Sequence, residues 1–99
     1  MWYAIISEDV ENSLPLRAKS RAAHLDRMKA LVEEGRVLIA GPHPAIDAEN
    51  PGAAGFSGSL VVVEFPSLED AQEWADADPY VEAGVYANVI VKPFKRVLP

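Results

Sequence analysis

Two ionisable residues far apart in the sequence offer the clearest chemistry in this chain. His24 lies inside a segment with helical periodicity, and Asp78 ends a second segment of this kind, immediately before Pro79 and Tyr80. Imidazole is the side chain whose unperturbed pKa is nearest neutrality, and a carboxylate can fix its tautomer and strengthen it as a base. The two residues therefore predict a small proton-transfer site, which requires that the fold bring them together.

Each of these residues also has an ordinary structural interpretation. A histidine at the edge of an apolar helix stripe is more often a packing residue than a catalyst, and an Asp-Pro pair often begins a turn. At the carboxyl end of its segment, the charge of Asp78 would also oppose the helix dipole. Arg21 favours the functional interpretation, because it projects into the apolar side of the helix and a guanidinium is costly to bury without a partner. Its candidate partners are Asp78, a buried carbonyl and an anionic ligand, and the sequence leaves this choice open.

Other candidate sites are weaker. His43 lies between two prolines and is a conceivable metal ligand together with His24 and Asp47, but no short ligand spacing is present. A loop histidine is the better interpretation, and we expect no metal. Ser59 follows Gly58 without the elbow motif of a serine nucleophile, so we expect its hydroxyl to hydrogen-bond a ligand or the backbone. The nearby glycines match no phosphate-binding loop, and we expect no cofactor.

The composition limits the class of protein. The chain has 99 residues, and we expect a single domain over residues 1–99. With 15 acidic against 9 basic residues, the net charge of −6 repels phosphate backbones and anionic membranes, so we expect neither nucleic-acid nor membrane partners. The absence of cysteine excludes disulfides and thiolate nucleophiles. Residues 1–6 are apolar but have neither a basic lead nor a cleavage site, so we expect a cytoplasmic protein.

Two helices and four strands are predicted to position the candidate residues. Helical periodicity covers residues 15–34, with Gly35 just beyond, and a second helix begins at the hydroxyl cap Ser67 and should stop at Asp78. Strand patterns cover residues 2–6, 37–40, 59–65 and 86–91, and residues 45–58 form the one long loop. The predicted apolar stripe of the first helix, with Leu31 at its margin, consists of Ala18, Ala22, Leu25, Met28 and Val32.

The order β-α-β-β-α-β predicts an α+β fold of the ferredoxin-like type, with a four-stranded antiparallel sheet and both helices on one face. A sheet with one face in water alternates apolar and polar residues, yet residues 1–6 and 60–63 are apolar without interruption. Two helices can cover only one face of this sheet. We therefore predict a homodimer in which the second faces of two sheets pack together.

Several short segments resemble those of the YciI-like family of bacterial proteins. The resemblance spans essentially the whole chain, and the combination of Asp-Pro-Tyr with a following Ala-Gly is fairly specific. Relatives often carry proline at the position of Ala22, a departure that affects helix geometry rather than chemistry. The matching segments are Arg21-Ala22-Ala23-His24-Leu25, Glu34-Gly35-Arg36, Ala40-Gly41-Pro42, the loop 47–58, Ser59, Ala75-Asp76-Ala77-Asp78-Pro79-Tyr80, Ala83-Gly84-Val85-Tyr86 and Val91-Lys92-Pro93-Phe94-Lys95.

This resemblance implies a dimeric α/β-barrel, in which two ferredoxin-like subunits pack their sheets together, and an active site centred on a histidine and an aspartate, here His24 and Asp78. Relatives in the same superfamily include muconolactone isomerases and small lyases or dehalogenating enzymes that act on ring-derived compounds. Many YciI-like proteins have no assigned reaction.

Together these observations predict a cofactor-independent lyase or isomerase acting on a small anionic or enolic molecule. His24 would move the proton, Asp78 would orient and stabilise the imidazole, and Arg21, Ser59 and Tyr80 would contact the substrate. Two alternatives stay open: a binding module that captures a small molecule without reaction, and a cluster that only braces the fold.

Overall fold

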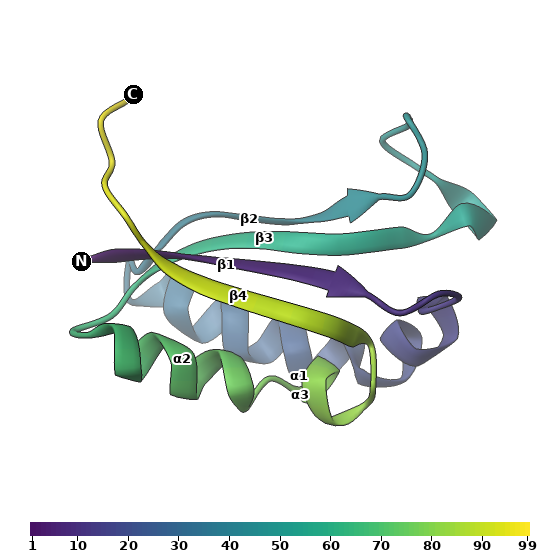
Figure 1. The fold of residues 1–99 in the computed structure, drawn as a ribbon, viewed down its shortest axis with the longest axis horizontal. Coiled ribbons are helices and arrows are strands. Elements are labelled where there is room, and N and C mark those ends of the chain that lie inside the picture. Colours follow the sequence, from purple (N-terminus) through teal and green to yellow (C-terminus); the bar gives the residue numbers. More distant parts are fainter.

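Four antiparallel strands form one sheet in the order β2-β3-β1-β4, and the helices cover one of its faces (Figure 1). The computed structural model describes residues 1–99. The strands are β1 (Trp2–Asp9), β2 (Val37–Pro44), β3 (Phe56–Glu64) and β4 (Tyr86–Phe94), and the helices are α1 (Leu14–Glu33), α2 (Leu68–Asp76), α3 (Pro79–Glu82) and the 3₁₀ turn η1 (Gly52–Ala54). The predicted ferredoxin-like fold is confirmed. None of the helices combines the length and the apolar character that a membrane span requires.

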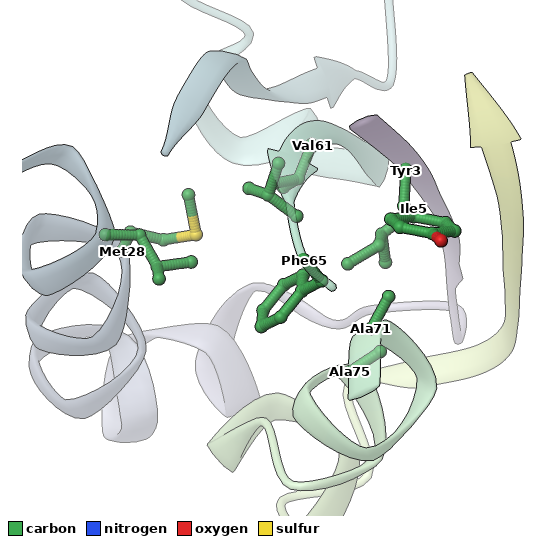
Figure 2. Packing of buried hydrophobic residues seen from close by; sticks show 9 residues of the cluster. Tyr3, Ile5, Met28, Val61, Phe65, Ala71 and Ala75 are labelled. Carbon is green, nitrogen blue, oxygen red and sulfur yellow. The ribbon is translucent and has the colours of Figure 1, made fainter. Parts of the chain in front are cut away.

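The central strands β1 and β3 carry the core because their alternate side chains face the helices. Ile5 of β1 is paired with Val61 of β3 and Val91 of β4, and these residues lie on the helix-covered face. Figure 2 shows Met28 of α1 pointing toward the β3 side chain of Val61. The small residues of α2 let that helix approach the sheet closely, and the whole buried cluster comprises Tyr3, Ile5, Met28, Leu31, Val61, Val63, Phe65, Ala71 and Ala75.

The helix boundaries follow local signals that the sequence displays. The hydroxyl of Ser67 accepts a hydrogen bond from the backbone N–H of Asp70 at 3.1 Å, as expected for the cap of α2. Gly35 follows the end of α1 with a φ of 71°, a left-handed conformation that glycine adopts without strain. Both predicted helix starts and the end of α1 are correct within one residue.

The predicted apolar stripe of α1 is wrong in part. Ala18 and Ala22 are exposed, and Val32 is 58% exposed, whereas the buried residues of the helix are Arg17, Met28 and Leu31. The side of α1 that faces the sheet therefore contains polar residues. When the buried face of the helix is assigned from apolar side chains alone, these polar residues are placed on the exposed face.

The hairpin β2–β3 is longer than the strand patterns predict, so the loop ends before Phe56 instead of at residue 58. His43 pairs with Gly58, and Pro44 pairs with Phe56. Prolines are tolerated here because β2 is an edge strand and needs few ladder donors. The consequence for the site is that β2 extends over the end of α1 that carries Arg17 and Arg21.

The second face of the sheet, which no helix covers (Figure 1), carries apolar residues together with Glu64, Lys92 and Asn88. The ladder pairing sets Leu60, Ile6 and Ile90 in one row across this face and Trp2 beside Phe94 in another. Ile90 is 46% exposed and Phe94 is 37% exposed. We call these five residues the outer sheet face.

Candidate active site

The fold brings His24 and Asp78 into direct contact. The Nδ1 atom of His24, on α1, lies 2.9 Å from both carboxylate oxygens of Asp78, in the connection between α2 and α3. The side chains are only 14% and 6% exposed. Because a carboxylate only accepts hydrogen bonds, Nδ1 carries the proton of this contact, and in the neutral imidazole Nε2 keeps its lone pair. A neutral ring in this arrangement is able to accept a proton on the side away from Asp78.

Asp78 is held by the start of α3 and does not lie at the end of the preceding helix. Helix α2 stops at Asp76, and Pro79 begins the short α3, so the expected conflict with a helix dipole at a carboxyl end does not arise. Asp78 is instead the cap residue of α3, and its Oδ1 accepts the backbone N–H of Tyr80 at 2.8 Å. The carboxylate is thereby fixed in the direction of His24.

Arg27 is a third member of the cluster that the sequence reasoning missed. Its Nη1 lies 3.5 Å from Asp78 Oδ2, and its Nη2 donates to the carbonyl of Trp74 at 2.6 Å. The guanidinium stacks over the Trp74 ring, 4.4 Å from the centroid. Burial lowers the pKa of Arg27, and the charge of Asp78 partly counters that effect. Arg27 follows His24 by three residues on the same helix, so the two side chains are neighbours on one face. This spacing is the feature of the sequence that could have identified Arg27.

Tyr80 forms one wall of the site by stacking on His24. The two ring centroids are 4.1 Å apart with planes inclined by 10°, and the rings of Tyr80 and Tyr86 form a T-shaped pair with centroids 5.6 Å apart. Burial raises the pKa of Tyr80, although the charges of Arg17 and Arg21 counter it in part. The stacked phenol holds the imidazole ring in one orientation.

The buried arginine is Arg17, and the expectation that Arg21 is buried in the apolar side is wrong. The Nε of Arg17 donates to Asp9 at 2.6 Å, and its Nη2 donates to Asp9 at 3.1 Å and to the carbonyl of Gly58 at 3.1 Å. Burial lowers the pKa of Arg17, but the hydrogen bond and the charge of Asp9 outweigh it, so the pKa lies above its ordinary value. The guanidinium of Arg17 therefore forms its hydrogen bonds with Asp9 and Gly58, whereas Arg21 is exposed.

A cavity of about 360 Å³ opens beside these residues, between α1 and the strands β2 and β3. This volume suits a small molecule. Four of the five predicted site residues, Arg21, His24, Ser59 and Tyr80, line it, and Asp78 lies behind His24. The rest of the lining, apart from Arg17, is apolar or glycine and consists of Leu14, Ala18, Leu25, Met28, Ala40, Gly41, Pro42, Phe56 and Val61.

The remaining candidates lie apart from this cluster. His43 is exposed on β2, and Asp47 is exposed in the loop that follows. No group of three or more histidine, cysteine, aspartate or glutamate side chains is arranged to hold a metal ion. His43 and Asp47 therefore have no part in the arrangement around His24.

Relatives of this chain match it over nearly its whole length. The model of the YCII-related domain covers residues 1–95. Protein YciI of Escherichia coli O6:H1 is 60% identical over 97 residues, which cover 98% of this chain and 99% of that protein. An uncharacterized protein of Haemophilus influenzae is 57% identical over the same shares.

Among solved structures, the chain is similar to 5-chloro-2-hydroxyhydroquinone dehydrochlorinase (TftG) of Burkholderia phenoliruptrix AC1100, determined in complex with 2,5-dihydroxybenzoquinone. The TM-score is 0.84 with 26% sequence identity, over 96% of this chain and 94% of that one. The fold described above is therefore shared with an enzyme that binds a small molecule.

Proposed function

Because this chain belongs to the YCII-related domain family, whose model spans residues 1–95, we propose that it is a cofactor-independent lyase or isomerase that moves a proton on a small anionic or enolic molecule. The observation that carries this proposal is the contact of 2.9 Å between His24 and Asp78 at the wall of a ligand-sized cavity. A base of this kind contributes most when its free nitrogen faces a pocket that excludes bulk water.

In this mechanism the imidazole of His24 removes the proton through Nε2. Asp78 holds the ring in the required tautomer and stabilises the imidazolium that forms. The charge of Asp78 is shared with Arg27 and with the N–H of Tyr80, so the carboxylate stays in place during the transfer. The proton then returns from Nε2 to another atom of the substrate in an isomerase, or to the leaving group in a lyase.

The substrate is held by a few polar groups on an apolar wall. Arg17 is paired with Asp9, whereas Arg21 forms no ion pair and supplies charge complementary to an anion. The hydroxyl of Ser59 supplies a hydrogen bond, and the ring of Tyr80 supplies a flat apolar surface. The dehydrochlorinase of the same fold binds 2,5-dihydroxybenzoquinone, a planar molecule that carries acidic oxygens. This likeness supports a ring-sized enol or quinol as the substrate.

We propose further that the active form is a cytoplasmic homodimer. The outer sheet face is apolar, and covering it with the same face of a second copy would remove Ile90 and Phe94 from water. The cavity lies on the opposite side of the sheet, among the helices, so this pairing would leave it open to the substrate.

A proton-exchange assay tests the reaction. Small cyclic enols and quinols, including 5-chloro-2-hydroxyhydroquinone, are incubated with the protein in D₂O, and deuterium incorporation and product formation are followed by NMR. For a compound that reacts, His24→Ala and Asp78→Asn should each slow the reaction by about a hundredfold or more while the fold is retained, since general acid–base catalysis contributes at least that much.

The matched control is His43→Ala, which removes an exposed imidazole outside the cavity and should leave the rate unchanged. Wild-type rates in His24→Ala and Asp78→Asn would show that the roles are misassigned. A compound that binds tightly but is recovered unchanged and without deuterium would instead identify a binding module.

A further inference from the structure

A second and much smaller cavity lies behind the imidazole. It measures about 10 Å³, about the volume of one water-sized sphere, so no substrate can enter it. The side chains of Ser7, Ser59 and Tyr86 reach it together with His24 and Asp78. Ser59 also lines the large cavity, whereas Tyr86 does not. Ser59 is therefore the one hydroxyl that connects the buried side of the site to the ligand side.

The hydroxyls of Ser59 and Tyr86 form a hydrogen bond of 3.2 Å. A phenol is more acidic than an aliphatic alcohol and is the weaker acceptor, since its oxygen lone pair is delocalised into the ring. The geometry allows either hydroxyl to donate, and the greater acidity of the phenol favours Tyr86 as the donor and Ser59 as the acceptor. The proton of Ser59 is then left free for a second partner.

The surroundings of Tyr86 keep this phenol protonated. Burial raises the pKa of Tyr86, the hydrogen bond of Ser59 acts against this, and the charge of Asp78 raises it further. Tyr86 lies at the start of β4, with its ring edge against Tyr80. Ser7, which is directly paired with Ser59 across β1 and β3, is 2% exposed, and its hydroxyl also acts to lower the pKa of Tyr86.

We propose that Tyr86 is a positioning residue that acts through Ser59. By donating to Ser59, it turns the Ser59 proton toward the large cavity, where that proton stabilises the oxyanion of the enolate formed when His24 removes a proton. Hydrogen bonds in a chain polarise one another, so the donor strength of Ser59 increases as well. This inference rests on the proposed function, and it adds a residue that never touches the substrate.

The test is a double-mutant cycle on the binding of 4-nitrophenolate, a ring-sized oxyanion, measured by calorimetry. Ser59→Ala should weaken binding by about tenfold to a hundredfold, the range for a hydrogen bond to a charged group. Tyr86→Phe keeps the ring against Tyr80 and should weaken binding by roughly threefold to tenfold, as expected for a bond that acts through another. The double variant Ser59→Ala/Tyr86→Phe should bind like Ser59→Ala alone.

Two controls separate positioning from a general structural effect. The uncharged analogue 4-nitroanisole should bind equally well to the wild type and to Tyr86→Phe. Tyr3→Phe, which removes a phenolic hydroxyl from the core cluster, should leave 4-nitrophenolate binding unchanged.

Two results would overturn the inference alone: Tyr86→Phe has no effect on 4-nitrophenolate binding, or it weakens binding by the same factor with and without Ser59. A wild-type protein that fails to bind 4-nitrophenolate at all would overturn the anionic pocket of the proposed function, and the inference with it.

Discussion

Asp78 is the residue on which three separate parts of the site converge. Its carboxylate receives the imidazole of His24 from α1, the N–H of Tyr80 from α3 and the charge of Arg27. The residue is 5% exposed, so these partners replace water rather than compete with it. A buried carboxylate satisfied in this way stabilises the native state only while all of its partners remain.

Removing that carboxylate should therefore destabilise the fold. We expect Asp78→Ala to lower the free energy of unfolding by about 2–4 kcal/mol, because it leaves His24 Nδ1 and the N–H of Tyr80 without an acceptor and removes the counter-charge of Arg27. Asp78→Asn keeps one oxygen for the N–H of Tyr80 and should lower it by about 1–2 kcal/mol. Urea unfolding of both variants is the measurement. Equal losses would show that the cap of α3 contributes nothing.

The sequence predicted the central pair of residues but not their neighbours. His24 and Asp78 were recognisable because few side chains perform proton transfer near neutral pH, whatever the fold. The buried arginine was misidentified, because its partner Asp9 lies at the end of β1 and only tertiary structure brings it to Arg17. Arg27 was missed for the same reason, since its contacts with Asp78 and Trp74 come from another element.

At the scale of elements, one glycine lets β1 and β3 approach at the site. A Cβ atom on Gly58 would lie 2.0 Å from the carbonyl oxygen of Ser7, a backbone atom that cannot turn aside. This approach sets Ser59 beside Ser7 and leaves the carbonyl of Gly58 available to Arg17. The narrow spacing of the two strands is thus part of the site.

Gly58→Ala should accordingly lower the free energy of unfolding by about 1–3 kcal/mol, because the strands must separate to admit the methyl group. Gly41→Ala is the control, since nothing lies within 4 Å of a Cβ atom at that position. Thermal and urea unfolding compare the two variants. A Gly58→Ala protein as stable as the control would mean that the strands separate without any loss in the free energy of unfolding.

The burial of Tyr80 on α3 and of Tyr86 on β4 makes the stability of the fold sensitive to pH in the alkaline range. Burial raises the pKa of both Tyr80 and Tyr86 in the folded chain. A raised pKa means that the folded state holds these protons more tightly than the unfolded state, in which tyrosine titrates near pH 10. The contribution is therefore complete below about pH 10 and is lost as the pH rises from there toward the folded pKa values.

We expect the melting temperature to fall less steeply above about pH 10 in Tyr86→Phe than in the wild type, because one of the two shifted phenols is gone. Scanning calorimetry between pH 8 and pH 11 measures this difference in slope. Parallel curves for the two proteins would contradict the raised pKa of Tyr86.

Element boundaries were predictable where a local signal marks them. Ser67 and Gly35 mark a helix start and a helix end through their own side-chain and backbone properties. The end of α2, the short α3 and the extension of β2 through Pro44 were not predictable, because cross-strand pairing and the capping role of Asp78 decide them.

At the scale of the whole molecule, the apolar outer sheet face is the feature that a single copy leaves unexplained. Ile90 on the edge strand β4 is 46% exposed and is paired with the apolar Ile6 of β1. The strand composition that predicted the α+β fold also predicted this second apolar surface, since the β1 and β3 segments carry apolar residues on both faces.

Light scattering after size exclusion should give the mass of a dimer at micromolar concentration. Ile90→Glu should shift it to a monomer, because the variant would bury a carboxylate in each half of the contact. The control Val32→Glu changes an exposed residue on α1, on the other side of the sheet, and should remain dimeric. A monomeric mass for the wild type would disprove the proposed homodimer.

Chemical rescue tests most directly whether the imidazole of His24 transfers the substrate proton. His24→Ala removes the ring from between Asp78 and the large cavity, so added imidazole can occupy the position that the side chain vacates. We predict that imidazole restores deuterium exchange to His24→Ala in a saturable manner, and that it fails to do so when Asp78→Ala is also present. Exchange at the wild-type rate in His24→Ala without any imidazole would contradict it.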